Sequence, residues 1–224
     1  MESGLPLLLA HRGARFTKSV PENTLPSFDL ALEHGCDGFE FDVRLTVDKQ
    51  LVVCHDPKHR SSVIARSQSH RLADLPRLND ILARYGHRVF LDIELKVAGM
   101  ESMVLAALRD HRPQRGYVVS SFLPAVIMEL KARSATVPTG IICDKPRQLA
   151  SWRKLPIDYV VAEKSLVKSG LVDEIHATGR KLLAWTVNDM KSMRESVHLG
   201  VDGIISDDTQ RLVQTLRPAS GKPS

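Results

Sequence analysis

Short apolar runs alternate with amphipathic stretches along most of this chain, and that alternation constrains the fold more than any other feature. A short apolar run predicts a buried strand, and apolar residues repeated on one helical face predict a helix. Strands and helices in alternation form right-handed βαβ units around a parallel sheet. The predicted strands are Leu7–His11, Gly38–Val43, Leu51–His55, Val89–Lys96, Tyr117–Phe122, Thr139–Cys143, Asp158–Glu163, Lys181–Val187 and Gly203–Asp207. The predicted helices are Leu25–His34, Leu78–Tyr85, Met100–His111, Pro124–Arg133, Arg147–Lys154, Leu166–Thr178 and Met190–Leu199.

One pair of predicted strands breaks the alternation, because the chain between Gly38–Val43 and Leu51–His55 is too short for a helix. Asp48 and Lys49 are expected to form a tight turn, so this pair is predicted to be a β-hairpin. Without the returning strand, eight strands remain, which is the number that closes a barrel. We therefore predict an α/β fold of the TIM type, a (β/α)8 barrel with a β-hairpin extension after its second strand.

The hairpin also predicts which side chains face each other. With the two turn residues at its centre, Asp42 would face His55 across the hairpin. Glu40 would lie on the same face as Asp42, because side chains two positions apart on a strand share a face. The hairpin is thus expected to bring a histidine beside two carboxylates.

The length of 224 residues, 43% of them hydrophobic, suits one core and is short for two. We predict a single domain over residues 1–224. Residues 57–76 show no clear period and are expected to be a short insertion near the functional site. Residues 217–224 are rich in Pro, Ala, Ser and Gly and are expected to be a flexible tail.

The charge of the chain bears on its partners. The formal net charge is +5, without a block of like charges, and such an excess can attract an anionic small molecule. Nucleic acid is not an expected partner, because no basic stripe is interleaved with aromatic residues. The sequence leaves the oligomeric state open.

The apolar and cysteine content predicts where the protein works. No segment reaches the roughly 20 apolar residues of a membrane span, and no secretory leader is expected. The three cysteines, Cys36, Cys54 and Cys143, are far apart, which is typical of a reducing compartment. We therefore expect a cytoplasmic protein without a transmembrane segment.

Carboxylates gather where two of the predicted strands end. Glu40 and Asp42 share one strand face, and Asp92, Glu94 and Lys96 alternate along one face of another strand. Carboxylates aimed into a barrel mouth repel each other unless a cation lies between them, and hard oxygen ligands favour Mg²⁺ or Ca²⁺. The alternative is that these acids are ion-paired strand residues, but three of them together favour a metal site.

Two histidines end predicted strands, His11 on the first and His55 on the returning strand of the hairpin. Imidazole transfers protons near neutral pH, and phosphodiester cleavage needs one group to take a proton and another to give one. Arg12 and Lys96 are suited to bind the phosphate group of such a substrate, because arginine offers a planar fork of donors and lysine a point charge. The alternatives are structural histidines and salt bridges to the neighbouring carboxylates.

The segment that follows the first predicted strand reads as a helix start, with Asn23 or Thr24 as the cap. Capping alone explains much of this pattern. Glu22 or Asn23 could also support the site from behind.

Other residues at strand ends are ambiguous. Phe122 and Trp185 could wall a pocket or belong to the core. The acids that end the last predicted strand, Asp207 and Asp208, are interpreted as possible caps rather than catalytic groups.

The ordered set of motifs resembles the glycerophosphodiester phosphodiesterase family from about the first strand to the last. The matching segments are His11-Arg12-Gly13, Pro21-Glu22-Asn23-Thr24, Glu40-Phe41-Asp42-Val43, His55-Asp56, Glu94-Leu95-Lys96, Trp185-Thr186-Val187-Asn188 and Gly200-Val201-Asp202-Gly203-Ile204. Any one of them would be a weak signal, whereas their order and spacing are specific.

The resemblance implies a TIM-type barrel that binds a divalent ion and hydrolyses glycerophosphodiesters to an alcohol and glycerol 3-phosphate. It implies His11 and His55 as the acid–base pair, and Arg12 and Lys96 as the groups that hold the phosphate. The implied metal ligands are Glu40, Asp42 and Glu94. The partner would then be a small-molecule glycerophosphodiester.

The chain departs from the family pattern after His55-Asp56, where the insertion is shorter than usual, and at Ser206-Asp207-Asp208, where Thr-Asp with a nearby Pro is usual. The shorter insertion leaves the accepted alcohol open. A lysophospholipase D-like activity is one alternative, because a trimmed cap could admit an acyl chain. A catalytically silent phosphodiester-binding protein is the other.

Overall fold

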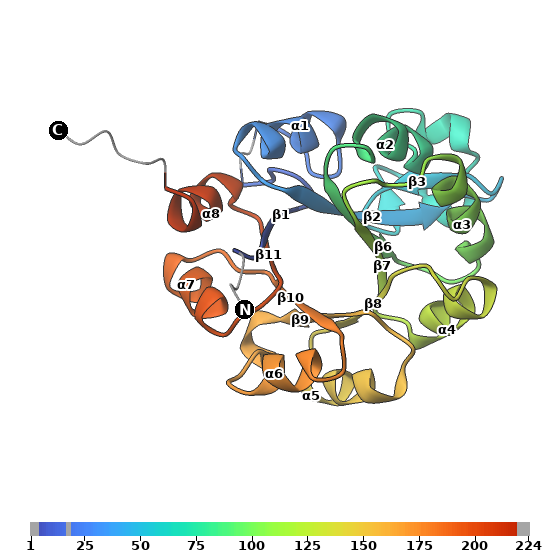
Figure 1. Cartoon of the computed structure of the whole chain (residues 1–224). Helices are drawn as coiled ribbons and strands as arrows, with labels where there is room; N and C mark the ends of the chain where they lie inside the picture. Colours follow the sequence, from blue (N-terminus) through green and yellow to red (C-terminus); the bar gives the residue numbers. More distant parts are fainter. Residues whose placement is uncertain (1–4, 17–18, 219–224) are drawn as a thin grey trace.

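A computed structural model describes residues 5–16 and 19–218 and contains a closed barrel of eight parallel strands, surrounded by helices (Figure 1). Around the barrel, each strand pairs in parallel with the next, and β1 pairs with both β2 and β11, which closes the ring. The barrel strands are β1 (Leu7–His11), β2 (Gly38–Leu45), β6 (Phe90–Leu95), β7 (Tyr117–Ser121), β8 (Thr139–Cys143), β9 (Tyr159–Glu163), β10 (Lys181–Trp185) and β11 (Gly203–Ser206). The predicted TIM-type fold is confirmed.

Eight α-helices in the described residues pack outside the barrel (Figure 1). They are α1 (Leu25–Glu33), α2 (Leu78–Tyr85), α3 (Glu101–Asp110), α4 (Pro124–Arg133), α5 (Pro146–Leu149), α6 (Leu171–His176), α7 (Met190–His198) and α8 (Thr209–Leu216). Short 3-10 turns lie at Ile64–Arg66 and Ser69–Leu72 before α2, at Ala150–Lys154 after α5 and at Lys164–Leu166 after β9. The predicted helix at 147–154 is thus α-helical only to Leu149 and 3-10 from Ala150 onward, and α8 was not predicted.

The barrel interior changes from apolar to acidic along its axis. Along β6 the inward side chains are Phe90, then Asp92, then Glu94, so the acids lie toward the carboxyl ends of the strands. An apolar cluster that includes Leu9 and Phe90 fills the lower part of the interior, while the larger core lies between strands and helices. Strands β2 and β6 are in register, with Glu40 beside Asp92. The fold therefore collects the acidic side chains at one end of the barrel.

The predicted hairpin is present, but its predicted register is wrong by one residue. Strand β3 (Leu51–Val53) pairs antiparallel with β2, with Val43 opposite Val53. The residue opposite Asp42 is therefore Cys54, whose amide donates to the Asp42 carbonyl at 2.9 Å. The turn holds three residues instead of two, and its last residue, Lys49, has φ 62°. This is the three-residue loop in which a type I turn is followed by a left-handed residue.

The short insertion predicted after the hairpin contains a small sheet of β4 (Lys58–His59) and β5 (Ser62–Val63). Its apolar side chains, Ile64 and Leu72, pack against Val52 of the hairpin and form a small separate core. The segment is therefore anchored to β3.

The chain end is partly described. Arg217, the first residue of the predicted flexible tail, forms a two-pronged ion pair with Asp37, with N–O distances of 2.7 and 2.8 Å. Asp37 also accepts from the amide of Leu8 at 2.8 Å, so α8 is tied to the start of β1 and β2. The remainder of the predicted tail, residues 219–224, lies outside the described residues.

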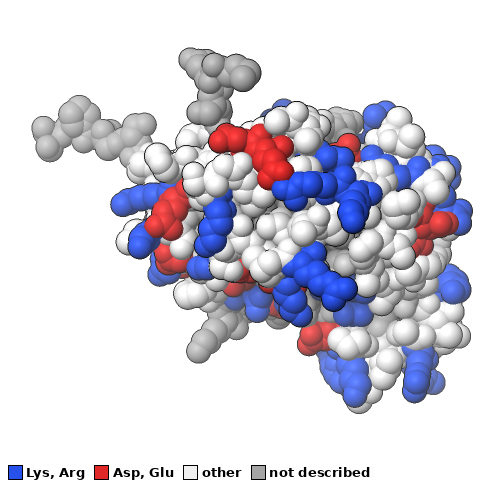
Figure 2. Space-filling view, turned by 90° about the horizontal axis from the view of Figure 1, so that it is seen from below, with Lys and Arg blue, Asp and Glu red and all other residues white. Residues whose placement is uncertain are grey.

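The surface shows no basic stripe in the view of Figure 2, where Lys and Arg stand in several groups among acidic and uncharged residues. No helix within residues 5–16 and 19–218 is both long and apolar enough to cross a membrane.

Replacement of Gly38 by alanine is expected to destabilise the barrel by about 3 kcal/mol or more, as overpacking does when backbone must move. A Cβ atom there would lie 1.8 Å from the carbonyl oxygen of Phe90, on the paired strand β6. Gly140→Ala is the control, because the nearest atom to its Cβ, at 3.1 Å, belongs to a side chain of Val118. Urea unfolding measures both variants, and equal midpoints would contradict the prediction.

Candidate active site

A cavity opens at the carboxyl ends of the barrel strands and brings the predicted functional residues together. Its lining contains nearly all of them, namely His11, Arg12, Glu40, His55, Glu94, Lys96, Phe122 and Trp185. Asp42 lies beside the cavity and is fully buried. Glu22 and Asn23 are not in this lining; Glu22 pairs with Arg12 of the lining, and Asn23 donates to Asp42 beside it.

The three carboxylates predicted as metal ligands converge. Glu40, Asp42 and Glu94 are all buried, and each offers an oxygen within 4.8 Å of the others. The Oε1 atom of Glu40 is buried without a hydrogen-bond partner among the described residues. Buried oxygens without donors are costly unless a cation or a proton satisfies them. The donor set is hard oxygen throughout, so it fits Mg²⁺ or Ca²⁺.

The electrostatics of the carboxylates differ with their neighbours. Burial raises the pKa of Glu40 well above its usual value, and Asp42 and Glu94 raise it further. Burial also raises the pKa of Glu94, with a contribution from Asp42, to about 7. For Asp42 burial acts in the same direction, but Lys96 and Arg12 outweigh it and lower the pKa of this carboxyl. Without a cation, the cluster therefore holds protons near neutral pH.

Asp42 is the centre of the polar network. Its carboxylate lies 3.2 Å from Lys96 Nζ and 3.3 Å from Arg12 Nε, and it accepts from Asn23 Nδ2 at 2.7 Å. Asn23 also accepts from the Asp42 amide at 3.3 Å, so its side chain bonds both the carboxylate and the backbone of this residue. Thr24 is the helix cap of α1. Asn23, the other capping candidate, does not cap the helix but hydrogen-bonds Asp42.

The two predicted phosphate-binding cations border the carboxylates. Lys96 Nζ lies 2.7 Å from Glu94 Oε1. The Arg12 guanidinium lies 3.0 Å from Glu22, and its backbone amide donates to Glu40 Oε2 at 3.1 Å. Arg12 also has φ 57°, a left-handed conformation that is uncommon outside glycine and that recurs at functional sites. Both cations line the cavity, so a phosphate there would meet them.

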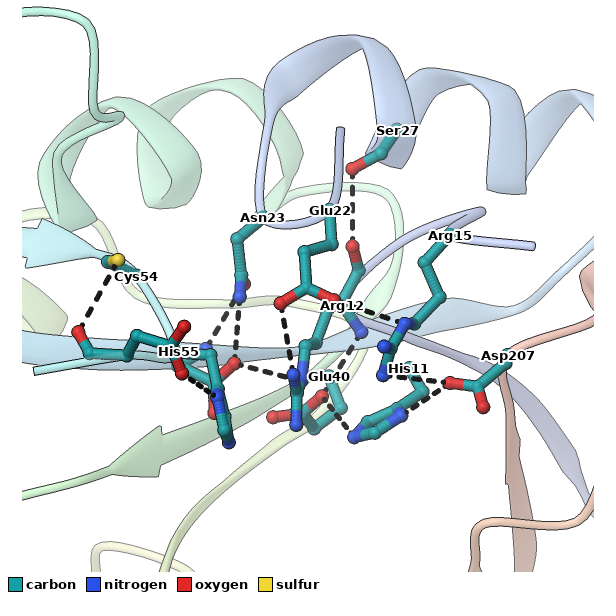
Figure 3. Close-up of polar contacts among 12 residues, drawn as sticks. His11, Arg12, Arg15, Glu22, Asn23, Ser27, Glu40, Cys54, His55 and Asp207 are labelled. Atoms are coloured by element: carbon teal, nitrogen blue, oxygen red, sulfur yellow. Dashed lines mark hydrogen bonds and ion pairs between the residues drawn. The ribbon is translucent and has the colours of Figure 1, made fainter. Parts of the chain in front are cut away.

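The two histidines enter the cavity from different elements, His11 from β1 and His55 from the loop after β3. In Figure 3 their side chains stand on either side of Arg12 and Glu40. The His55 Nδ1 atom lies 2.9 Å from Asp56 Oδ1, and its carbonyl accepts from the Arg44 guanidinium. In the observed register β3 ends at Val53, so His55 lies beyond the strand. The Arg44 contact holds it at the cavity.

His11 is much more enclosed than His55. Its Nδ1 atom lies 2.7 Å from Asp207 Oδ1, and its Nε2 atom lies 3.8 Å from Glu40 Oε2. Burial lowers the pKa of His11, against the opposing effect of its hydrogen bond to Asp207. A neutral imidazole near pH 7 is suited to accept a proton.

The opposite wall of the cavity is apolar. Phe122 and Trp185 stand edge to face with ring centres 5.7 Å apart, and Ile142, Val161 and Ile205 complete this wall. The site therefore has one charged half, from β1, β2 and β6, and one apolar half, from the later strands.

Sequence reasoning did not assign three residues at the site. Burial raises the pKa of Asp92, below Glu94 in the cavity, to about 7, although Ser120 donates to it at 2.5 Å. Arg15 pairs with both Glu22 and Asp207. Asp207, considered as a cap, contacts His11, whereas Asp208 caps α8. The position of Asp207 at the end of the last strand was the available signal.

The barrel and its acidic, histidine-containing mouth define an enzyme of the phosphodiester hydrolase class. The family model for the glycerophosphoryl diester phosphodiesterase family matches residues 11–88 and 79–211. The chain belongs to this family, and the resemblance seen in its motifs is confirmed.

Similar proteins cover nearly the whole chain. A glycerophosphodiester phosphodiesterase of Caldanaerobacter subterraneus subsp. tengcongensis is 28% identical over 245 residues, which is 94% of this chain and 98% of the relative. A putative glycerophosphodiester phosphodiesterase of Bacillus subtilis is 29% identical over 231 residues, 89% of this chain and 93% of the relative.

Solved structures agree with this assignment. An Oleispira antarctica phosphodiesterase, solved in complex with the product sn-glycerol-3-phosphate, has a TM-score of 0.82 and 26% identity, and the match covers 94% of this chain and 96% of that one. A putative glycerophosphoryl diester phosphodiesterase of Silicibacter pomeroyi has a TM-score of 0.83 and 25% identity, with coverage of 95% and 93%.

Proposed function

We propose that this protein hydrolyses glycerophosphodiesters to an alcohol and glycerol 3-phosphate, with a divalent cation and a pair of histidines. The observation that carries the proposal is the convergence of two histidines, three carboxylates, an arginine and a lysine on one cavity. Family membership and a relative solved with sn-glycerol-3-phosphate support the substrate class.

Glu40, Asp42 and Glu94 would hold the cation, Mg²⁺ or Ca²⁺. When bound, the ion supplies positive charge that neutralises the phosphate and favours the developing negative charge. The protein contributes a buried site whose carboxylates are already gathered and whose Glu40 Oε1 atom is without a hydrogen-bond partner in the described part of the chain.

His11 and His55 would carry the protons. One takes the proton of the attacking nucleophile, which is water or a substrate hydroxyl, and the other gives a proton to the leaving alkoxide, which is the division of work that in-line cleavage requires. Their placement on either side of Arg12 and Glu40 suits a phosphate bound between them (Figure 3). Arg12 and Lys96 would orient that phosphate, and each now pairs with a carboxylate whose place a phosphate oxygen can take.

A substrate panel tests the proposal. Purified protein is incubated with glycerophosphocholine, glycerophosphoethanolamine and glycerophosphoinositol in Mg²⁺ or Ca²⁺, and glycerol 3-phosphate is measured. Release of glycerol 3-phosphate from at least one substrate is expected. Binding of these compounds without turnover would instead establish the silent phosphodiester-binding protein.

A lysophospholipase D-like activity is the second candidate, and the apolar half of the cavity favours it. An opening of about 440 Å³ between the Pro21–Thr24 segment and the insertion adds room beside His55. Lysophosphatidylcholine added to the panel decides between the two. A kcat/KM for the lysolipid above that for glycerophosphocholine would make it the main activity.

The cation is expected to stabilise the protein more at pH 7.5 than at pH 5.5. In the folded protein the pKa of Glu94 is about 7, above the usual value of about 4.3 for an unfolded chain. The pKa of Asp92 is likewise raised to about 7 on folding. Between these values the folded protein holds protons that the unfolded chain has released. The metal-free protein therefore loses stability as pH rises through this range, on the order of 1 kcal/mol per pH unit and group.

Differential scanning fluorimetry in chelator, Mg²⁺ and Ca²⁺ measures this effect. The rise in melting temperature on addition of the ion should grow from pH 5.5 to 7.5, because deprotonated carboxylates bind it. In Glu94→Gln the rise in melting temperature caused by the ion should depend less on pH, because one titrating ligand is gone. A rise of equal size at both pH values would contradict the prediction.

A further inference from the structure

Asp207, at the end of the last barrel strand, makes the one side-chain hydrogen bond of His11 within residues 5–16 and 19–218. Its Oδ1 atom lies 2.7 Å from His11 Nδ1, on the side of the ring away from Glu40 (Figure 3). An ionised carboxylate is an acceptor only, so the contact requires a proton on Nδ1. The other ring nitrogen, Nε2, then points toward Glu40 and the cavity.

Other residues hold Asp207 in place. Asn188 Nδ2 donates to Asp207 Oδ2 at 2.8 Å, and Asn188 Oδ1 accepts from the Asp207 amide at 2.9 Å. Arg15 Nη1 lies 3.3 Å from Asp207 Oδ1. Although burial opposes it, the hydrogen bond with His11 helps to lower the pKa of Asp207, which keeps the carboxylate ionised.

We propose that Asp207 is a positioning residue that holds His11 with its proton on Nδ1 and presents Nε2 to the substrate phosphodiester. The proposal rests on the proposed function for its effect on turnover, whereas the state of the His11 ring can be measured without turnover. In serine proteases, an aspartate in the same relation to a histidine fixes the tautomer and orientation of the ring.

The hydrogen bonds around Asp207 dictate what an asparagine would do there. Asn188 cannot turn its amide, because Asn188 Oδ1 already accepts from Ser206 Oγ at 3.1 Å and from the Asp207 amide. The new amide is therefore expected to keep its oxygen toward Asn188 Nδ2 and to turn its NH₂ group toward His11, while Arg15 loses its contact at this position and keeps its ion pair with Glu22. That NH₂ group donates to Nδ1, so the ring proton moves to Nε2.

The test uses Asp207→Asn in the full chain. Long-range ¹H–¹⁵N correlation spectra of the histidine rings, assigned by the loss of signals in His11→Ala, report which nitrogen carries the proton. The expected result is a proton on Nδ1 in the wild-type protein and on Nε2 in Asp207→Asn. With the best substrate of the panel, kcat should fall by at least about 10²-fold, while KM changes by less than about threefold.

Asp208→Asn is the matched control, because it removes the neighbouring carboxylate without contact to His11. Asp208 accepts from the Arg211 amide as the cap of α8, and asparagine caps helices equally well. The His11 spectrum and kcat should stay those of the wild-type protein. If Asp207→Asn fails to fold, Asn188→Ala is measured instead. In this variant we expect signals of His11 with its proton on Nδ1 and on Nε2, and a kcat lower by about tenfold.

An unchanged His11 spectrum in Asp207→Asn overturns the proposal, whatever happens to kcat. A changed spectrum with unchanged kcat also overturns it, because the ring state would then not matter for turnover. If the wild-type protein turns over no substrate of the panel, the proposed function fails, and the spectra alone decide whether Asp207 sets the His11 ring.

Discussion

Replacement of His11 or His55 by alanine is expected to lower kcat by at least about 10²-fold, the usual contribution of a general acid or base. Both rings line the cavity and flank Arg12 and Glu40, so each is placed to move a proton on one side of a bound phosphodiester. KM should change much less, because phosphate binding is assigned to Arg12 and Lys96. Steady-state kinetics on the best substrate of the panel measure both constants.

His87→Ala is the control for these variants, since this exposed histidine precedes β6 at the opposite end of the barrel. A nitrophenyl ester of glycerophosphate separates the two roles, because a nitrophenolate leaves without being protonated. The variant that lacks the acid should recover most of its rate on this ester, and the variant that lacks the base should not. Wild-type turnover in either alanine variant would remove that histidine from the mechanism.

Chelation of divalent ions is expected to stop turnover, and Glu40→Gln is expected to weaken ion binding at least about tenfold. Glu40 is buried against Asp42 and Glu94, and glutamine keeps its shape while removing one negative charge from the cluster. Hard cations bind through charged oxygens, so the loss of one carboxylate lowers affinity directly. Isothermal titration with Mg²⁺ and with Ca²⁺ measures the change.

Glu33→Gln, an exposed glutamate at the end of α1, is the matched control and should bind the ion as the wild-type protein does. Activity in chelated protein should return when Mg²⁺ or Ca²⁺ is added back in excess. Full turnover in excess chelator would falsify the metal requirement, and unchanged ion affinity in Glu40→Gln would place the ion elsewhere.

The barrel itself could be predicted because its elements are specified locally. The bounds of β1, β8, α2 and α4 match the predicted ranges residue for residue. The converging acids could be predicted too, since strand ends in a parallel barrel meet at one face. Helix α8 was missed although its apolar residues Leu212, Val213 and Leu216 share one helical face, as the helical period requires; Asp208 caps it, and it packs against α7.

The hairpin register could not be predicted from its turn residues alone. Asp48 and Lys49 suit either a two-residue or a three-residue loop, and Asp48 distinguishes them: the two-residue hairpin turns need a positive φ at their first residue, whereas here Lys49 has a positive φ and Asp48 does not. One residue of difference exchanges the faces of a strand, so Cys54 took the place expected for His55. His55 still reaches the cavity because it lies past the end of β3, where the pleat no longer sets its direction.

Contacts between distant residues were the least accessible to sequence reasoning. Asp207 and His11 are 196 positions apart, and nothing local to either residue indicates the other. Asp92 is similar, because its neighbour Ser120 comes from another strand and its burial depends on the closed barrel. Side-chain pairs between strands depend on which strands are neighbours in the barrel, so they can be predicted only after the strand order is known.

Closure of the ring between β1 and β11 has a consequence for synthesis in the cell. Because the first strand pairs with the last, a nascent chain on the ribosome must emerge almost completely before His11 can meet Asp207. Until then, one edge of β1 has no strand beside it and can attract other chains. A release-dependent last step of this kind would keep truncated translation products inactive, whatever part of the cavity they had already formed.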